Sequence, residues 1–392
     1  MLTFRKLGVP ILLVSDAPEL LTGLGRVGRD LATLLCSLPQ FRVAYAGMGG
    51  AGRRKFCWTQ YSFPDNGQFG CDVIPQFWND FAGNEPGIIM SLWDLSRMMY
   101  FGQPQGLPEP LARFYGPGRN FERWGYVPCD GTGPNEVSLP VGMQGAAMGY
   151  DRILAASEWG ANVIRNTRPD CDWIPHGLWM DKFKPMPDAR KILGWEDSVV
   201  LGCNMANQAR KDWPVAFECA RILKADYGNR FKFWAHTDVL VRYWNLYALA
   251  ADYGVQDCLE VTVDCVDEQL ALRYSACDAT IVPSGGEGFS FCTAEAQACG
   301  TSSIVADYAA AQEIVPDECK VFPVAYKIDT SHCVRRAVLS GYGFASRAKQ
   351  QMERKQNDWD GTVEYFTKRV SHLSWEHLQY PWRRWLLEGI GQ

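Results

Sequence analysis

The apolar positions in the first half of the chain predict alternating strands and helices. Residues 9–15 form a continuous apolar run of strand length, which is typical of a strand buried on both faces. Residues 26–38 carry apolar side chains at helical spacing, and residues 41–47 form a second apolar run. A strand, a helix and a strand in this order imply parallel pairing with a right-handed crossover. Further short strands are predicted at 87–93, 123–130 and 152–158.

A second series of the same kind begins near residue 198. Its strands are predicted at 198–207, 230–237, 258–263, 278–284 and 301–307, and its helices at 212–227, 241–254, 267–277 and 291–300. Two such series predict two doubly wound α/β domains, which we place at 1–175 and 176–369. A segment with three prolines, 171–187, links them. The helical tail at about 370–392 is expected to return to the first domain.

Two stretches of the first half interrupt this pattern. Residues 51–86 and 103–122 are rich in glycine, proline and aromatic residues. Stretches of this kind between periodic segments are typical of loops that carry function. We therefore predict long functional loops there rather than parts of a core.

The composition is that of a globular protein without a general affinity for polyanions. The 392 residues are 47% hydrophobic and carry a net charge of −5, so a nucleic acid or an anionic membrane would need a local basic patch. Arginine pairs at 335–336 and 383–384 are the candidates, and a solvated helix face is the simpler interpretation of both. The 14 cysteines lack CxxC spacing, and no apolar run approaches the roughly 20 residues of a membrane-spanning helix. We expect reduced thiols and a cytoplasmic location, and any contact with a membrane is expected to be peripheral.

A glycine-rich segment at 23–28 satisfies the GxGxxG pattern of dinucleotide-binding loops. In that motif the first glycine lies directly after the first strand, whereas Gly23 comes eight residues after Ser15. The motif also needs an acidic residue at the end of the second strand, and no Asp or Glu occurs between Asp30 and Asp65. The interpretation as an NAD-dependent dehydrogenase therefore fails. Two interpretations remain, a helix start that binds an anion and a plain flexible loop.

The densest candidate chemistry follows the strand predicted at 278–284. The glycine-rich stretch 285–288 lets the backbone approach a ligand closely, and a helix is predicted to begin near Ser290. Glu287 lies in this stretch and Glu295 lies in the helix, with seven residues between them. Ionised carboxylates only accept hydrogen bonds, so they suit paired hydroxyls such as a ribose diol or sugar hydroxyls. A surface salt bridge is the ordinary role of a helical glutamate, but this helix is apolar enough to predict burial.

Two cations are predicted near this loop. Arg210 and Lys211 follow the strand at 198–207, at its carboxyl end. A pair of cations there fits a diphosphate, and it can stabilise a phosphoryl leaving group in place of a metal ion. Such pairs are usually solvated, and the glycine-rich loop is what favours the binding role.

Several segments together resemble one family. Residues 22–32, 174–186, 207–212 and 273–307 are similar to the GT-B retaining glycosyltransferases of the family 4 (group 1) type. The resemblance is patchy from 9 to 160 and nearly continuous from 150 to 315. It implies the α/β GT-B fold, in which two Rossmann-like doubly wound domains face a central cleft. The first domain would hold the acceptor and the second the nucleotide-sugar donor.

The resemblance also implies a role for each matching residue. Glu287 and Glu295 match the family's E-x7-E pair, the first implied to bind the donor sugar and the second the nucleotide ribose. Lys211 matches the diphosphate-binding lysine, and Gly23 with Gly25 matches the N-terminal phosphate loop. The implied donor-binding residues are Gly23, Gly25, Arg210, Lys211, Glu287, Gly288, Phe289, Ser290 and Glu295.

The chain departs from the family pattern in two places. The family carries an arginine five or six residues before its lysine, where this chain has Met205 and Ala206, so Arg210 must substitute or the phosphate grip is weaker. Many relatives carry a histidine after the fourth strand of the first domain. The matching position here is Asp130, and Asp94 is a second candidate. Each aspartate has a plain alternative as a cap of a loop turn.

His176 is the earliest of the five histidines, and it lies at the link between the predicted domains. Its position between a proline and a glycine is more typical of a structural hinge than of a catalytic base. We keep it as a secondary candidate.

These observations predict a retaining, metal-independent glycosyltransferase that moves a sugar from a nucleotide-sugar to an acceptor hydroxyl. The implied catalytic residues are Asp130, Glu287, Arg210 and Lys211. Neither a DxD motif nor His/Cys ligand spacing suggests a metal, and the nucleotide-sugar is a co-substrate rather than a cofactor. The acceptor is expected to be a carbohydrate, a lipid-linked group or another hydroxyl. The alternatives are a non-catalytic sugar-nucleotide-binding protein, a sugar-nucleotide epimerase of the same fold, and transfer onto a modified base in DNA.

Overall fold

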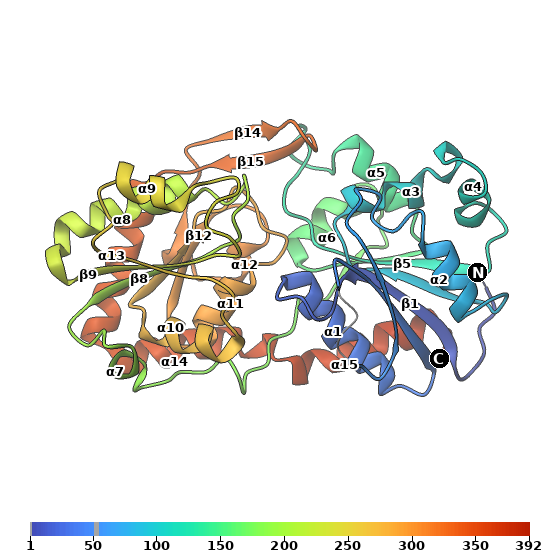
Figure 1. The fold of residues 1–392 in the computed structure, drawn as a ribbon, viewed down its shortest axis with the longest axis horizontal. Helices are drawn as coiled ribbons and strands as arrows, with labels where there is room; N and C mark the ends of the chain where they lie inside the picture. The colour runs from blue at the N-terminus through green and yellow to red at the C-terminus, as the bar shows by residue number, and fades with distance from the viewer. Residues whose placement is uncertain (1, 51–54) are drawn as a thin grey trace. The chain divides into compact units, whose positions relative to one another are not determined.

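The computed structural model describes residues 2–50 and 55–392, which fold into two compact units (Figure 1). Unit 1 comprises residues 1–176, 331–334 and 378–392, and unit 2 comprises 177–330 and 335–377. The predicted domain boundary was placed at 175/176. No helix in the described part of the chain is both long and apolar enough to cross a membrane.

Unit 1 is built on a seven-stranded sheet in the order β3-β2-β1-β4-β5-β6-β7, with every neighbouring pair parallel. Its strands are β1 (Val9–Asp16), β2 (Phe41–Met48), β3 (Thr59–Phe63), β4 (Gly87–Ser91), β5 (Phe121–Val127), β6 (Arg152–Ala155) and β7 (Asp172–Trp173). The first seven residues of β1 are buried, as expected for a parallel strand with both faces covered. The strand order reverses between β1 and β4, so the chain has a topological switch point there.

Helices cover both faces of this sheet. They are α1 (Gly23–Cys36), α2 (Ile74–Phe81), α3 (Met99–Gly102), α4 (Leu111–Tyr115), α5 (Val141–Met148), α6 (Glu158–Arg165) and α15 (Trp375–Gly389), with the short 3-10 turns η1 (Leu95–Met98) and η2 (Pro104–Gly106). Figure 1 shows α1 and α15 on one face and α2 and α5 on the other. In α15, the Trp385 ring lies 5.2 Å from that of Trp124 between centroids, and the Trp385 carbonyl accepts a 3.0 Å hydrogen bond from Arg152.

The prediction that 51–86 and 103–122 lie outside the core is wrong in part. Residues 51–54 lie outside the described residues, but the remainder contains β3, α2 and α4. Trp78 is 1% exposed and Phe63 is 4% exposed. The reason is helical spacing, since Ile74, Trp78 and Phe81 bury one face of α2 despite the glycine and proline around it.

Unit 2 repeats the architecture of unit 1 with a six-stranded sheet in the order β10-β9-β8-β11-β12-β13, and its pairs are parallel throughout. Its strands are β8 (Val199–Asn204), β9 (Phe231–His236), β10 (Leu259–Thr262), β11 (Ala279–Val282), β12 (Ser302–Ala306) and β13 (Lys320–Val321). The strand order reverses between β8 and β11, which are direct neighbours. All the predicted strands of the second series are therefore present.

The helices of unit 2 are α7 (Ala189–Leu193), α8 (Trp213–Tyr227), α9 (Leu246–Asp252), α10 (Asp267–Ala276), α11 (Phe291–Ala298), α12 (Ala311–Ile314), α13 (Gly341–Asn357) and α14 (Trp359–Val370), with the 3-10 turns η3 (Gly228–Arg230), η4 (Asp317–Cys319) and η5 (Ser371–Leu373). The predicted helix at 241–254 is shorter, because Asn245 caps α9 by accepting hydrogen bonds from Tyr247 N and Ala248 N. The hydrophobic pattern gave no prediction for several other elements of unit 2, among them β14 (Ala325–Asp329), β15 (Val334–Val338) and α13.

Candidate functional site

Two loops of unit 2 meet at the switch point of its sheet. One follows β8 and covers residues 205–212, and the other follows β11 and covers residues 283–290. Gly285 N donates to Arg210 O at 2.8 Å, and Asp212 N donates to Pro283 O at 2.9 Å. In open α/β sheets, ligands bind outside the carboxyl ends of the strands at such a switch point. The two loops therefore form the candidate site of this unit.

The structure brings Arg210, Lys211 and Glu287 together at these loops. Lys211 Nζ donates a hydrogen bond to Glu287 Oε1, and Arg210 Nη1 donates to the same oxygen at 3.1 Å. Arg210 Nη1 also donates to the carbonyl of Gly286 at 3.0 Å. Lys211 and Glu287 are 7% and 6% exposed, so these two form a buried ion pair, whereas the Arg210 side chain is 26% exposed.

Burial and charge act in opposite directions on this cluster. Burial raises the pKa of the Glu287 carboxyl, but the charges of Lys211 and Arg210 outweigh it and hold that pKa at about 2. Burial also lowers the pKa of Lys211, and the carboxylate of Glu287 opposes this shift. Glu287 is therefore a carboxylate at neutral pH, and it offsets one of the two positive charges that sequence reasoning assigned to a diphosphate.

Glu295 lies about one turn into α11 and is 2% exposed, so the predicted burial of this helical glutamate is correct. Its Oε2 accepts a 3.0 Å hydrogen bond from the hydroxyl of Tyr274. That hydroxyl in turn accepts a 2.6 Å bond from Asn204 Nδ2, at the end of β8. Sequence reasoning missed Tyr274 and Asn204, and the position of Asn204 at a strand's carboxyl end is the signal that could have found it.

The residues between the two glutamates form a strained helix start. Ser290 has φ 93° and ψ 77°, a left-handed conformation that is costly for a residue with a side chain. Its Oγ lies 2.8 Å from Thr293 Oγ1, and Phe289 is 5% exposed against Phe291. Gly288 comes directly before them. Strain of this kind gathers at functional sites, which agrees with the implied donor-binding role of this stretch.

In unit 1, Gly23 and Gly25 open α1. Thr22 caps this helix, since its Oγ1 accepts a 3.0 Å hydrogen bond from Gly25 N. A Cβ on Gly25 would lie 2.7 Å from the carbonyl oxygen of Ala17, so the packing of the loop itself requires a glycine there. The GxGxxG segment thus has a structural reason in this fold, besides the implied phosphate role.

Asp94 and Asp130 both follow carboxyl ends of the unit 1 sheet, after β4 and β5 respectively. Burial raises the pKa of the Cys129 thiol to about 12, and the negative charges of Asp130 and Asp94 add smaller contributions in the same direction. Both aspartates therefore lie near Cys129. The Asp94 carboxylate lies 3.9 Å from Arg97 Nε.

Sequence reasoning missed Asp16 at this edge of unit 1. Its Oδ1 accepts hydrogen bonds from Trp93 Nε1 at 3.1 Å and Arg97 Nη1 at 3.2 Å, and its Oδ2 accepts one from Thr22 at 2.9 Å. The position of Asp16 at the carboxyl end of the first strand is the signal that could have drawn attention to it.

His176 is buried in unit 1, where its Nδ1 lies 2.7 Å from the Tyr126 hydroxyl. Burial lowers its pKa to about 3, so the ring is neutral near pH 7. These surroundings favour the structural interpretation over a catalytic base.

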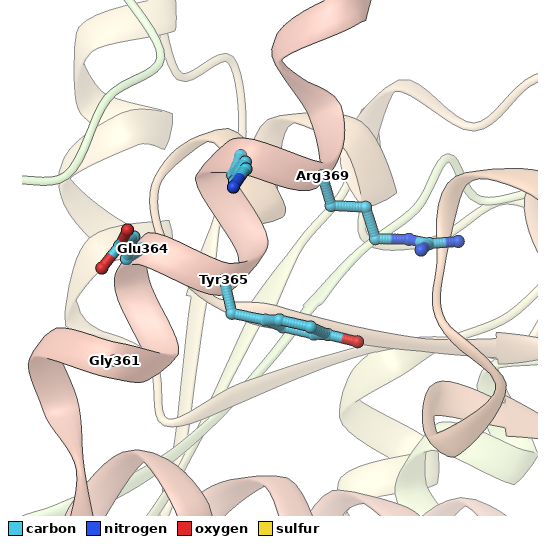
Figure 2. A pocket seen from close by; sticks show the side chains of 5 residues that line it. Gly361, Glu364, Tyr365 and Arg369 are labelled. Carbon is cyan, nitrogen blue, oxygen red and sulfur yellow. The ribbon is translucent and has the colours of Figure 1, made fainter.

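Outside these loops, two features bear on ligand chemistry. Within the described residues, no cluster of three or more His, Cys, Asp or Glu side chains is arranged to hold a metal ion. A surface hollow of about 560 Å³ lies on α14, and Figure 2 shows Tyr365 and Arg369 reaching to the same side of this helix. Tyr365 donates to Glu318 Oε1 at 3.0 Å and Arg369 Nε to Ile314 O at 3.0 Å, so both serve to attach α14. None of the residues that line this hollow belongs to the loops at 205–212 and 283–290.

Sequence comparison finds similarity to a known family over part of the chain. The model of the group 1 glycosyl transferases matches residues 243–329. The D-inositol 3-phosphate glycosyltransferase of Frankia alni is 38% identical over 207 residues, which are 48% of this chain and 49% of that protein. That of Geodermatophilus obscurus is 35% identical over 143 residues, 34% of this chain and 32% of that protein. The matches thus span a third to a half of these relatives.

Structural comparison covers both units. Sucrose-phosphate synthase from Thermosynechococcus elongatus has a TM-score of 0.71 at 16% identity, with 98% of this chain and 99% of that chain covered. The Anabaena protein HepE, solved with UDP and glucose, has a TM-score of 0.66 at 13% identity, with 98% and 99% covered. At such identities the likeness concerns the fold, and that fold is GT-B. The resemblance to the group 1 glycosyl transferases is confirmed over part of the chain, and the fold is GT-B, whereas the family 4 and retaining parts of that resemblance stay predictions.

Proposed function

We propose that this chain is a glycosyltransferase that moves a sugar from a nucleotide-sugar to an acceptor hydroxyl, with retention of configuration and without a metal ion. The observation that carries the proposal is the buried Lys211–Glu287 pair, joined by the half-buried Arg210, at the switch point of unit 2. Two cations on one loop and a carboxylate on the glycine-rich loop supply partners for both a diphosphate and a sugar.

The cations would stabilise the diphosphate leaving group. As the bond from the sugar to the phosphate breaks, negative charge grows on the phosphate oxygen and positive charge grows at the sugar carbon. Arg210 is already oriented by the carbonyl of Gly286, so little reorganisation is needed to meet that charge. A bound diphosphate would take the place of the Glu287 carboxylate beside Arg210 and Lys211. Glu287 would then accept hydroxyls of the transferred sugar.

Glu295 would hold the ribose diol of the nucleotide. A carboxylate accepts hydrogen bonds from two hydroxyls without needing to donate any. The Tyr274 hydroxyl fixes the orientation of the Glu295 carboxylate by donating to its Oε2. Asn204 fixes Tyr274 in turn.

Unit 1 would bind the acceptor. Asp130 would accept a hydrogen bond or the proton from the acceptor hydroxyl, and Asp94 is the second candidate for this role. Its glycine loop at Gly23 and Gly25 would lie near phosphate. We assign the chain to the family 4 type with no cofactor beyond the donor, and the acceptor class stays a carbohydrate, a lipid-linked group or another hydroxyl.

Thermal unfolding with a panel of UDP-, GDP- and ADP-sugars tests the donor assignment. A ligand at 100 times its Kd stabilises the folded chain by about 2.7 kcal/mol, which is a clear rise in Tm. The donor that binds is then incubated with the protein, and release of the free nucleoside diphosphate is measured with and without candidate acceptor sugars. A chain that binds a donor but never releases its nucleotide would be the non-catalytic binding protein instead.

A further inference from the structure

The backbone that carries Arg210 and Lys211 is attached to an aromatic side chain from another loop. The indole Nε1 of Trp244 donates hydrogen bonds to the carbonyl oxygens of Gln208 at 3.2 Å and Lys211 at 3.0 Å. Trp244 lies in the loop between β9 and α9. One N–H group thereby joins the two ends of the turn 208–211.

Trp244 is itself locked in place by a reciprocal pair of bonds. Its backbone N donates to Asn207 Oδ1 at 2.9 Å, and Asn207 Nδ2 donates to its carbonyl at 2.8 Å. Asn207 also donates from Nδ2 to Val239 O at 2.9 Å and from its backbone N to Asp238 Oδ1 at 2.6 Å. Asn207 is 1% exposed, so water does not compete for these bonds.

The opposite edge of the same turn is attached to the second loop of the site. Gly285 N donates to Arg210 O, and Asp212 N donates to Pro283 O. The turn is therefore held on one edge by the loop that carries Glu287 and on the other by Trp244. The turn also carries two backbone hydrogen bonds of its own, from Lys211 N to Gln208 O at 3.1 Å and from Trp213 N to Lys211 O at 2.8 Å, and the Trp244 indole adds a side-chain donor to the same two carbonyls.

We propose that Trp244 is a positioning residue for the Arg210–Lys211 pair. Its indole N–H fixes the peptide groups at 208 and 211, and thereby the direction in which the Lys211 side chain leaves the backbone. Lysine side chains carry much rotamer freedom, so a fixed starting direction matters for where Nζ arrives. The inference rests on the proposed function, in which Lys211 binds the donor diphosphate.

The test is a Trp244→Phe variant of the full chain, which keeps an aromatic ring and removes the N–H donor. Trp213→Phe is the matched control. Trp213 lies two residues after Lys211 and is fully buried, and its Nε1 finds no hydrogen-bond partner among the described residues. Both variants lose an indole N–H close to the turn, but only one loses hydrogen bonds.

UDP, GDP and ADP are titrated calorimetrically into each protein, and each nucleotide is compared with its nucleoside. For the nucleotide that binds, Trp244→Phe is expected to weaken affinity roughly 3- to 10-fold, in keeping with a lost hydrogen bond. The nucleoside, which lacks phosphates, should bind as before, and Trp213→Phe should leave the ratio of the two affinities unchanged. In a Lys211→Ala background, Trp244→Phe should cost little more, because both changes act on one contact. An equal loss for nucleotide and nucleoside, or a full additional loss beside Lys211→Ala, overturns the proposal.

Hydrogen exchange separates this inference from the proposed function. Trp244→Phe is expected to speed amide exchange at 207–212 relative to Trp213→Phe, whether or not any nucleotide binds. Unchanged exchange there overturns the positioning role even in a chain that binds nucleotides. Faster exchange in a chain that binds none of the three keeps the attachment of the turn and overturns the proposed function.

Discussion

The carboxyl edges of the two sheets have the same topology and very different charge environments. In unit 2 the Lys211 and Glu287 side chains are 9% and 8% exposed, whereas in unit 1 the Arg97 and Asp16 side chains are 29% and 14% exposed. Ion pairs interact more strongly where water is excluded, and they are costly there unless every member is paired. The edge of unit 2 is thus arranged for one charged group in a fixed place. The wetter edge of unit 1 suits adaptable hydroxyl contacts.

The largest expected effect comes from removing a cation at the buried edge. Lys211→Ala should weaken binding of the cognate nucleoside diphosphate by about 1.5–3 kcal/mol, the range of hydrogen bonds to charged groups, and should lower turnover as well. Arg97→Ala, at the edge of unit 1, should leave nucleotide affinity unchanged. Calorimetric titration of both variants checks this. An equal loss in both would remove the functional distinction between the two edges.

The two glutamates of unit 2 should respond differently. Glu295→Gln is expected to weaken donor and free nucleotide alike by about 1–2 kcal/mol, because the amide offers one acceptor and one donor where the ribose needs two acceptors. Glu287→Gln should leave nucleotide affinity intact or tighten it, since Arg210 and Lys211 then lose a competing carboxylate. Its turnover should fall. Titrations and initial rates on both variants decide, and the opposite assignment would reverse the direction of the donor in the site.

A smaller effect is expected from acid, which should reduce the difference in the free energy of unfolding between wild type and Glu287→Gln. The pKa of Glu287 in the folded chain is about 2, below that of an unfolded glutamate, so its contribution to stability is complete above about pH 5. The contribution is lost as the pH falls towards 2. Burial of the pair offsets part of the attraction, so the effect is modest. Urea unfolding between pH 3 and 7 should therefore show the stability gap between the two proteins narrowing in acid, and a gap that widens would contradict the buried ion pair.

The smallest expected effect is that of a chelator. If Arg210 and Lys211 stabilise the leaving group, EDTA should not change the rate of transfer. The measurement is an initial rate before and after dialysis against EDTA, with added Mg²⁺ or Mn²⁺ as the control. A strict requirement for either metal would show that cationic side chains alone do not serve the buried edge.

The comparison of the two edges also shows how far the sequence could be interpreted. The central strands of both units could be predicted because a parallel strand buried on both faces reads as a short apolar run, as at Val9–Asp16 and Ala279–Val282, whereas the outer strands β3, β7 and β13 were missed. The helix α2 was missed because glycine and proline around it concealed a short amphipathic face. The β14–β15 ribbon was missed because its apolar residues do not follow burial: four of the five residues of β14 are exposed, Tyr326 and Ile328 among them.

By itself, the sequence determined the alternation of strands and helices, the E-x7-E spacing and the presence of two cations after a strand. Only the tertiary structure decided that Arg210 and Lys211 pair with Glu287, 77 and 76 positions away. It also decided that Trp244 donates hydrogen bonds to the turn 208–211 that carries the two cations. The physical reason is that strand order depends on which faces bury together over the whole unit. The pairing of β8 with β11 brings these loops into contact, and no local pattern in either segment encodes it.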